Sequence, residues 1–144
     1  MWMVTIRIRR YNPDTDYTQV SDLYKDPKTY GGQYDQARDS EAKLRHLSQT
    51  KPNCILVAEI DGDIAGTVTI FEDGRSAWLF RFAVQKKFEL ELSKALYQEA
   101  KKILKKMGHT QVLVFAPNDK GFDLRYHTLG FKKGGDYTAY WEDI

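Results

Sequence analysis

Two adjacent lysines, Lys86 and Lys87, lie between an apolar segment and a long amphipathic segment. Residues 77–84 are almost entirely apolar, which predicts a buried strand, and apolar residues recur at three- and four-residue intervals over residues 92–107, which predicts a helix. A helix that follows a strand through a short loop presents free backbone N–H groups at its start, and such groups bind anions. The junction is therefore a candidate anion site, although a solvated loop is the alternative interpretation of the lysines.

Arg81 is the one charged residue within residues 77–84. It shares a strand face with Leu79 and Ala83, which predicts that it is at least partly buried. A buried guanidinium needs a partner of opposite charge. Two interpretations stay open: an internal ion pair with an acid on a neighbouring strand, or two-bond recognition of a carboxylate on a substrate.

The remaining reactive side chains do not indicate a metal or disulfide site. Cys54 is the single cysteine, and the three histidines have no metal-ligand spacing. The first ten residues alternate instead of forming the apolar core of a signal peptide, and no apolar run approaches the roughly 20 residues needed to span a bilayer. We therefore expect a cytoplasmic protein with no metal, no export signal and no membrane partner.

Composition narrows the class of protein further. The 144 residues suit one domain that spans residues 1–144, and 42% hydrophobic with 13% aromatic residues is typical of a globular core. The 22 basic and 20 acidic residues nearly cancel, which leaves a net charge of +2. A nucleic-acid binder is expected to carry a concentrated basic excess, so we expect no nucleic-acid partner.

Hydrophobic periodicity predicts the elements that position these groups. Asp61-Gly62-Asp63 is a strong hairpin signal between two apolar runs. The predicted elements, in order, are a strand at 2–9, a helix ended by Pro27, a helix from about Ser40, strands at 54–60, 64–71 and 77–84, the long helix at 92–108, a strand at 111–116, a helix at 122–129 and two strands within 131–141. This order predicts a mixed α/β sheet.

This order of elements, together with four segments between residues 55 and 131, resembles the GNAT-type N-acetyltransferase superfamily across nearly the whole chain. Residues 55–71, with the turn DGDIAG, are similar to the second and third strands of that family. Residues 82–84 are similar to the end of its fourth strand, whose backbone pairs with the pantetheine arm of acetyl-CoA. The helix at 92–108 resembles the one whose N-terminus receives the pyrophosphate. Tyr126, four residues before Gly130, is similar to the family's "Y…GF" ending.

The resemblance implies a single-domain α/β (α+β) fold with a mixed, mostly antiparallel sheet flanked by helices. It also implies acetyl-CoA as co-substrate and transfer of an acetyl group to a primary amine of a small molecule or a peptide. A homodimer is left open. The cofactor-binding residues that it implies are Phe82, Ala83, Val84, Phe88, Glu89, Leu90, Glu91, Leu92, Ser93, Lys94 and Asn118.

Residues 86–93 depart from the family's usual phosphate loop, Gln/Arg-x-x-Gly-x-Gly/Ala. Alignment on the helix puts Phe88 at the basic position, Glu91 at the first glycine and Ser93 at the second. A Cβ in place of glycine obstructs close approach of the backbone to a pyrophosphate, and a carboxylate from Glu89 or Glu91 repels it. Two interpretations remain: acetyl-CoA still binds because the lysines keep the charge positive, or the chain is a catalytically impaired binding or regulatory module.

Tyr126 is the catalytic residue that the resemblance implies, as the proton donor to the departing thiolate. A phenol has an ordinary pKa of about 10, close enough to that of a thiol for this role. The alternative is that Tyr126 only packs a short helix on the sheet. Asn118 lies near the position of an asparagine that bonds the pantetheine arm in the family, although an ordinary turn explains it equally well. Glu72, Asp136 and a water chain are open as the general base.

The acceptor pocket is expected opposite the pyrophosphate, because the resemblance implies that the amine approaches from that side. It would lie between the loop at residues 30–34, Arg81 and the last strand around residues 137–141, and an acceptor with a carboxylate would suit Arg81. Aromatic side chains there offer apolar walls with a polar tip. For the loop, a turn with exposed aromatics is the alternative. The substrate-binding residues expected are Tyr30, Tyr34, Arg81 and Tyr137.

Overall fold

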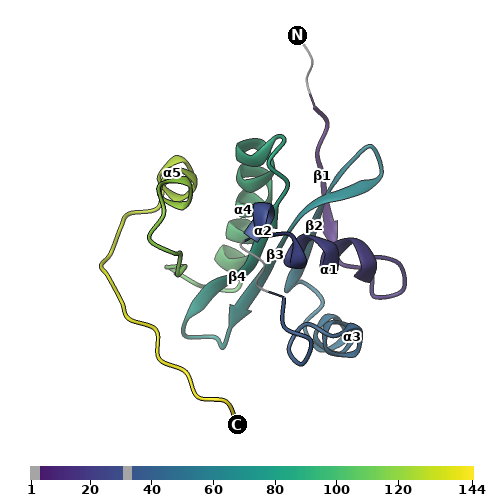
Figure 1. Cartoon of the computed structure of the whole chain (residues 1–144), viewed down its shortest axis with the longest axis horizontal. Coiled ribbons are helices and arrows are strands. Elements are labelled where there is room, and N and C mark those ends of the chain that lie inside the picture. The colour runs from purple at the N-terminus through teal and green to yellow at the C-terminus, as the bar shows by residue number, and fades with distance from the viewer. Residues whose placement is uncertain (1–3, 31–33) are drawn as a thin grey trace.

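The computed structural model describes residues 4–30 and 34–144, and its core is a four-stranded antiparallel sheet in the order β1-β2-β3-β4 (Figure 1). α4 packs on one face of this sheet, and α1 and α3 pack on the other. The elements are β1 Arg7–Arg10, α1 Tyr17–Lys25, α2 Pro27–Tyr30, α3 Glu41–Thr50, β2 Ile55–Ile60, β3 Asp63–Glu72, β4 Ala77–Val84, α4 Glu89–Lys106 and α5 Lys120–Thr128.

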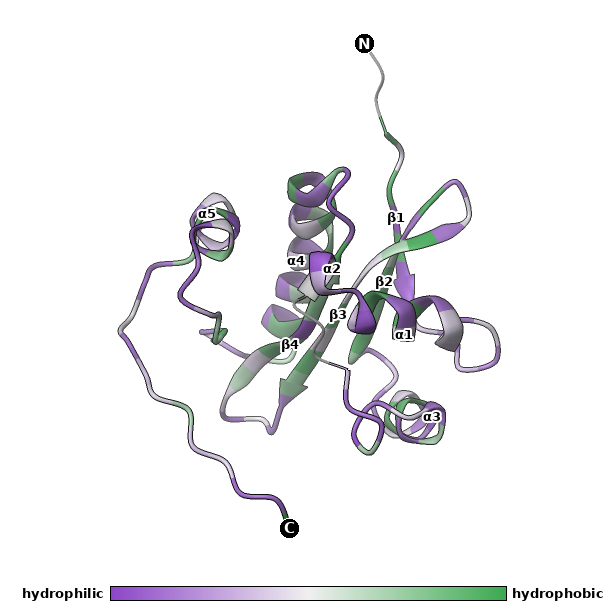
Figure 2. Ribbon diagram, in the orientation of Figure 1, coloured by the Kyte–Doolittle hydropathy of each residue, from purple (hydrophilic) through white to green (hydrophobic). Residues whose placement is uncertain are grey.

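The central strands are apolar on both faces because helices cover both faces. In β2, Leu56 and Ala58 face α4, whereas Ile55 and Val57 face α1 and α3. Figure 2 shows the same distribution, with hydrophobic residues concentrated along the strands and polar residues on the outer sides of the helices. This double burial explains why residues 54–60 form a continuous apolar run in the sequence.

The β2–β3 hairpin confirms the turn predicted from the sequence. Asp61 and Gly62 have φ values of 53° and 83°, and Ile60 pairs with Asp63, so the loop has two residues with positive φ. Asn-Gly and Asp-Gly sequences favour this turn because glycine adopts positive φ without a steric cost.

α4 packs closely against the sheet at Gly66. Leu92, Leu96, Ala100 and Leu104 form its buried face, which confirms the predicted helical periodicity. A Cβ at Gly66 would lie 2.9 Å from Val84 Cγ1 and 3.1 Å from Leu96 Cδ1, so any larger residue would require these side chains of β4 and α4 to shift. The helix begins at Glu89, three residues before the predicted start.

The helices before the sheet follow the prediction with one difference. α3 begins after Ser40, where the sequence predicted a helix to start, and Ser40 caps it by accepting a hydrogen bond from Lys43 N at 3.2 Å. Pro27 ends α1 as expected, but it also begins the single turn of α2, where its missing N–H costs nothing.

Four predicted strands differ from the structure. β1 begins at Arg7; residues 2 and 3 of the predicted strand lie outside the described residues. Residues 111–116 contribute only a parallel bridge, Trp78 with Leu113. Residues 131–144 form no strand and do not join the sheet (Figure 1). A segment of alternating apolar and polar residues forms a strand only where it can pair with a free strand edge. Residues 111–116 form only the bridge at Leu113, so they provide no such edge for the final segment.

No helix within the described ranges combines the length and the apolar composition that crossing a bilayer requires.

Candidate functional site

The end of β4 is separated from the rest of the strand by a bulge. Thr67 pairs with Ala83 and Thr69 pairs with Phe80, so Arg81 and Phe82 together oppose a single residue of β3. Arg81 has a φ of 50°, in the left-handed region. On the outer side of β4 the only bridge in the described part of the chain is at Trp78, so residues 82–84 present a backbone edge without a strand partner.

A second residue with left-handed backbone follows this edge. Phe88 has a φ of 63° and occupies the N-cap position of α4 without a capping hydrogen bond from its side chain. Left-handed backbone costs roughly 1–2 kcal/mol for a residue with a Cβ, and such strain gathers at functional sites. The free edge of β4 therefore lies between two strained residues, Arg81 and Phe88.

The first turns of α4 carry six of the residues expected to bind the cofactor. Glu89, Leu90, Glu91 and Lys94 lie at or near the surface, whereas Leu92 and Ser93 are buried. Leu92 packs in the core, so it is not available to a ligand. The Ser93 hydroxyl is buried without a hydrogen-bond partner among the described residues.

Arg125, which the sequence did not single out, joins β4 to α4 from α5. Its Nη1 donates a hydrogen bond to Phe82 O at 3.2 Å, and its Nη2 donates to Glu89 Oε1 at 2.8 Å. Lys86 Nζ lies 3.6 Å from the other oxygen of Glu89. The only sequence signal was an arginine next to Tyr126, and it does not identify Glu89, 36 positions away, as the partner.

Tyr126 lies beside the free end of β4. Its side chain is 8% exposed, and its ring packs edge-on to Phe82 at 6.4 Å and to Phe131 at 5.4 Å. The structure thus forms the packing contacts of the alternative interpretation, and it also brings the phenol next to residues 82–84. Asn118 is exposed just before α5, whose N-cap is Asp119.

Arg81 forms the internal ion pair that was one of its two interpretations. Nε and Nη2 donate to Asp39 Oδ1 and Oδ2 at 3.0 and 2.8 Å. The partner acid comes from the loop before α3 and not from a neighbouring strand. Asp39 lies in an irregular loop, 42 positions from Arg81 in the sequence, which explains why periodicity could not identify it.

The expected acceptor residues lie in different neighbourhoods. Tyr34 OH lies 3.2 Å from Tyr17 OH, and Lys25 Nζ lies over the Tyr34 ring. Burial and the hydrogen bond with Tyr34 raise the pKa of Tyr17, so this hydroxyl stays protonated. Tyr137 is 79% exposed and contacts Phe115 on the outer side of β4. Tyr30 ends α2, and residues 31–33 of the loop lie outside the described residues.

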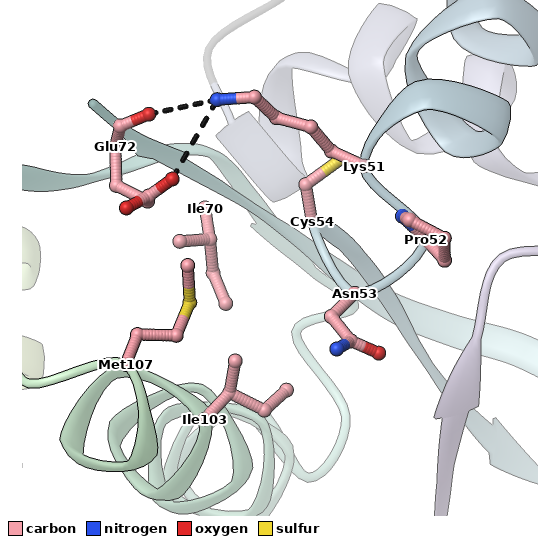
Figure 3. A pocket seen from close by; sticks show the side chains of 8 residues that line it. All are labelled: Lys51, Pro52, Asn53, Cys54, Ile70, Glu72, Ile103 and Met107. Carbon is pink, nitrogen blue, oxygen red and sulfur yellow. Dashed lines mark hydrogen bonds and ion pairs between the residues drawn. The ribbon is translucent and has the colours of Figure 1, made fainter. Parts of the chain in front are cut away.

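A cavity of about 180 Å³ lies at the opposite end of the sheet, between Cys54, Ile70 and Met107 (Figure 3). Glu72 closes one side of it and pairs with His109 at 2.8 Å. Since Glu72 is opposite Ala77 in the β3–β4 ladder, it is roughly 20 Å along the strand from Val84. The cavity and Glu72 are therefore remote from the free edge of β4.

Two further observations concern reactive groups. Burial raises the pKa of the Cys54 thiol to about 11, so the thiol is protonated and a poor nucleophile. Within the ranges that the structure describes, no three His, Cys, Asp or Glu side chains are arranged to hold a metal ion.

The free strand edge, the helix start and the adjacent phenol form one site, and a sequence comparison identifies its family. A model of the acetyltransferase (GNAT) family matches residues 10–131. The chain belongs to this family. A comparison with curated protein sequences finds no significant match.

Solved structures share the GNAT fold at low sequence identity. PaiA N-acetyltransferase from Thermoplasma acidophilum, in complex with coenzyme A, is 21% identical with a TM-score of 0.75 and 93% of each chain covered. Glucosamine-6-phosphate N-acetyltransferase from Arabidopsis thaliana is 18% identical with a TM-score of 0.73, and 96% of this chain and 99% of that chain are covered. A Pyrococcus horikoshii protein assigned as an acetyltransferase is 15% identical with a TM-score of 0.66; 93% of this chain is covered, but only 46% of that one.

Proposed function

We propose that the protein transfers an acetyl group from acetyl-CoA to a primary amine of a small molecule or a peptide. The observation that carries the proposal is the unpaired outer edge of residues 82–84 next to the buried phenol of Tyr126. Membership of the GNAT acetyltransferase family supports the reaction class.

The residues present fit acetyl-CoA in three respects. The backbone edge of residues 82–84 offers hydrogen bonds to the amides of a pantetheine arm, in the manner of an added strand. Lys86 and Arg125 supply positive charge where α4 begins. The buried Ser93 hydroxyl, without a partner in the described residues, leaves a polar group for a ligand near the same helix start. Glu91 is exposed, so its carboxylate is solvated.

Acetyl-CoA supplies an activated acyl group in the form of a thioester. The backbone N–H groups at the end of β4 are suited to stabilise negative charge on a carbonyl oxygen, which is the usual way in which acyl transfer is accelerated. Tyr126 Oη provides the proton for the departing thiolate, and its surroundings of Phe82 and Phe131 exclude water.

The amine acceptor is proposed to bind near Tyr34, on the face of the sheet that α1 and α3 cover. Glucosamine-6-phosphate N-acetyltransferase, by its name, acts on the amine of a small sugar phosphate, so a small amine suits the shared fold. Asp39 occupies the two-nitrogen edge of Arg81, so an acidic acceptor would have to displace it. We therefore propose the primary amine, without a carboxylate, as the feature that is recognised.

Thermal unfolding with added acetyl-CoA tests the binding half of the proposal. A ligand at 100 times its Kd stabilises the folded state by about 2.7 kcal/mol, which gives a clear rise in Tm for a chain of this size. We expect this rise with acetyl-CoA and with CoA. An unchanged Tm at millimolar acetyl-CoA would reject the proposal.

A second candidate function is CoA binding without catalysis. It is favoured by the two carboxylates, Glu89 and Glu91, in the first turn of α4, which a helix that receives phosphates does not need. This candidate predicts the rise in Tm without release of CoA in the presence of any amine.

A further inference from the structure

Arg125 is a buried guanidinium whose hydrogen bonds are incomplete. Its side chain is 3% exposed, and its Cζ lies 5.5 Å from the ring centroid of Phe82 and 5.3 Å from that of Phe122. Nη1 is bonded to Phe82 O and Nη2 to Glu89, but Nε is buried without a partner among the described residues. A buried N–H group without an acceptor is uncommon and costs free energy, so a ligand oxygen beside Nε would be stabilised.

A comparison with Arg81 shows what Arg125 lacks. Nε and Nη2 lie on one edge of the guanidinium group, and this edge binds two oxygens of a carboxylate or a phosphate in parallel. At Arg81 both nitrogens donate to Asp39. At Arg125 only Nη2 is used, by one oxygen of Glu89. The Nε–Nη2 edge of Arg125 is therefore half filled.

Glu89 is a partner that an anionic ligand can replace. It is the first residue of α4, and its side chain is 24% exposed. Its carboxylate lies between Arg125 and Lys86, at 2.8 and 3.6 Å, where the helix N-terminus also favours negative charge. Because the side chain reaches solvent, a rotation can remove the carboxylate while the helix stays in place.

We propose that Arg125 binds the diphosphate of CoA, and that Glu89 occupies Arg125 until the diphosphate displaces it. Each phosphate of the diphosphate offers two oxygens to the Nε–Nη2 edge, and the diphosphate as a whole carries two negative charges where a carboxylate carries one, so it competes successfully for this position. The inference rests on the proposed function, since the ligand is the same CoA. It assigns the cation for the diphosphate to α5 and not only to the lysines of the loop before α4.

Arg125 lies next to Tyr126 in α5 and shares a contact with it. Its Nη1 remains bonded to Phe82 O, so the guanidinium links α5 to the end of β4. Tyr126 follows directly in α5, and its ring packs on the same Phe82. The residue proposed to bind the diphosphate and the proposed proton donor therefore both contact Phe82 at the end of β4.

Isothermal titration calorimetry with CoA, inorganic pyrophosphate and pantetheine, which lacks the diphosphate, tests the inference. Glu89→Gln keeps the shape of the side chain but removes the charge that occupies Arg125. Arg125→Gln removes the guanidinium. Glu91→Gln is the matched control, because it removes the same charge from the same helical turn, while Glu91 is exposed and forms no ion pair in the described part of the chain.

We expect Glu89→Gln to bind pyrophosphate and CoA more tightly than Glu91→Gln does, by about threefold or more. Arg125→Gln should weaken both by about tenfold or more, and pantetheine should bind all variants equally. Equal affinities of the two glutamine variants for pyrophosphate, or a folded Arg125→Gln with wild-type affinity, would overturn the inference. If Arg125→Gln does not fold, the comparison of Glu89→Gln with Glu91→Gln decides, since both keep Arg125.

The failure of this inference can be told from the failure of the proposed function. Acetyl-CoA binding and turnover that are insensitive to Arg125→Gln would keep the proposed function and overturn the inference. A wild-type protein that binds pyrophosphate but neither CoA nor acetyl-CoA would reject the proposed function and CoA as the ligand of Arg125.

Discussion

Arg81 and Asp39 form a buried ion pair in which two guanidinium nitrogens donate to the two carboxylate oxygens at 3.0 and 2.8 Å. The pair ties the loop before α3 to the bulge of β4, and the Arg81 guanidinium also lies over the Phe80 ring at 4.5 Å. The ion pair holds β4 at its bulge, between Trp78, which bridges to Leu113, and the free edge at residues 82–84 beside Tyr126. It belongs to the scaffold of the site.

Asp39→Ala is expected to lower the free energy of unfolding by about 3–5 kcal/mol, because it leaves a buried guanidinium without its partner. The double variant Asp39→Ala with Arg81→Met should recover part of this loss, since no unpaired charge remains. Urea denaturation measures both. The control is Arg75→Ala, whose pair with Asp73 is exposed and should contribute nothing measurable. A loss for Asp39→Ala no larger than for Arg75→Ala would show that the buried pair is unimportant.

Gly66→Ala is expected to destabilise the protein by about 1–3 kcal/mol, because the added Cβ would overlap Val84 and Leu96. Gly134→Ala is the matched control, since a Cβ there meets no atom within 4 Å. Thermal unfolding of the two variants should therefore give a clearly lower Tm for Gly66→Ala only. Similar Tm values for both would mean that α4 can move away from the sheet without cost.

Asp16 is expected to make stability depend on pH in the acid range. Burial acts to raise the pKa of its carboxyl group, but hydrogen bonds from Arg9 and from Asn12 N outweigh burial and hold that pKa below its ordinary value of 3.8. When the pKa of a carboxyl group is lower in the folded state, the ionised group stabilises the fold at any pH above its unfolded-state pKa. This stabilisation is lost as the pH falls through the folded-state pKa. In urea denaturation Asp16→Asn should be less stable than wild type at about pH 6, and the difference should shrink below about pH 3. A difference independent of pH would contradict this.

Local signals in the sequence predicted the elements that depend on local physics. The Asp61-Gly62 hairpin follows from the backbone preference of glycine, and α4 follows from the spacing of its buried residues. The candidate site was harder to predict from the sequence. Its residues 82–84 and Tyr126 were found through the family resemblance, whereas the Arg125–Glu89 contact joins residues 36 positions apart on two different helices. No periodic pattern contains that information.

The strands predicted within residues 131–141 are a second case in which a local pattern carried no information about a distant partner. Tyr137, Ala139 and Trp141 alternate with polar residues or tyrosine, which predicts a strand, but alternation does not specify a partner edge. In the structure residues 132–144 are exposed, and Phe131 is the last residue that packs on the core.

Truncation after Lys133 tests whether the final segment serves only the acceptor. Phe131, which packs on Tyr97 and Tyr126, is retained, so the Tm should change by no more than a few degrees. If Tyr137 helps to bind the acceptor, the KM for the amine should rise while the affinity for CoA stays constant. A large fall in Tm would show that the segment belongs to the folded core, and unchanged kinetics would remove Tyr137 from the acceptor site.

The rate at which the protein releases CoA from acetyl-CoA in the presence of a panel of primary amines tests the central claim most directly. Wild type should release CoA with at least one amine, and Tyr126→Phe should lower this rate by about 10²–10⁴-fold at unchanged CoA affinity, because it removes only the proton donor. An unchanged rate in Tyr126→Phe would confine this residue to packing. A wild-type protein that binds acetyl-CoA but releases no CoA with any amine would contradict the proposed acetyl transfer.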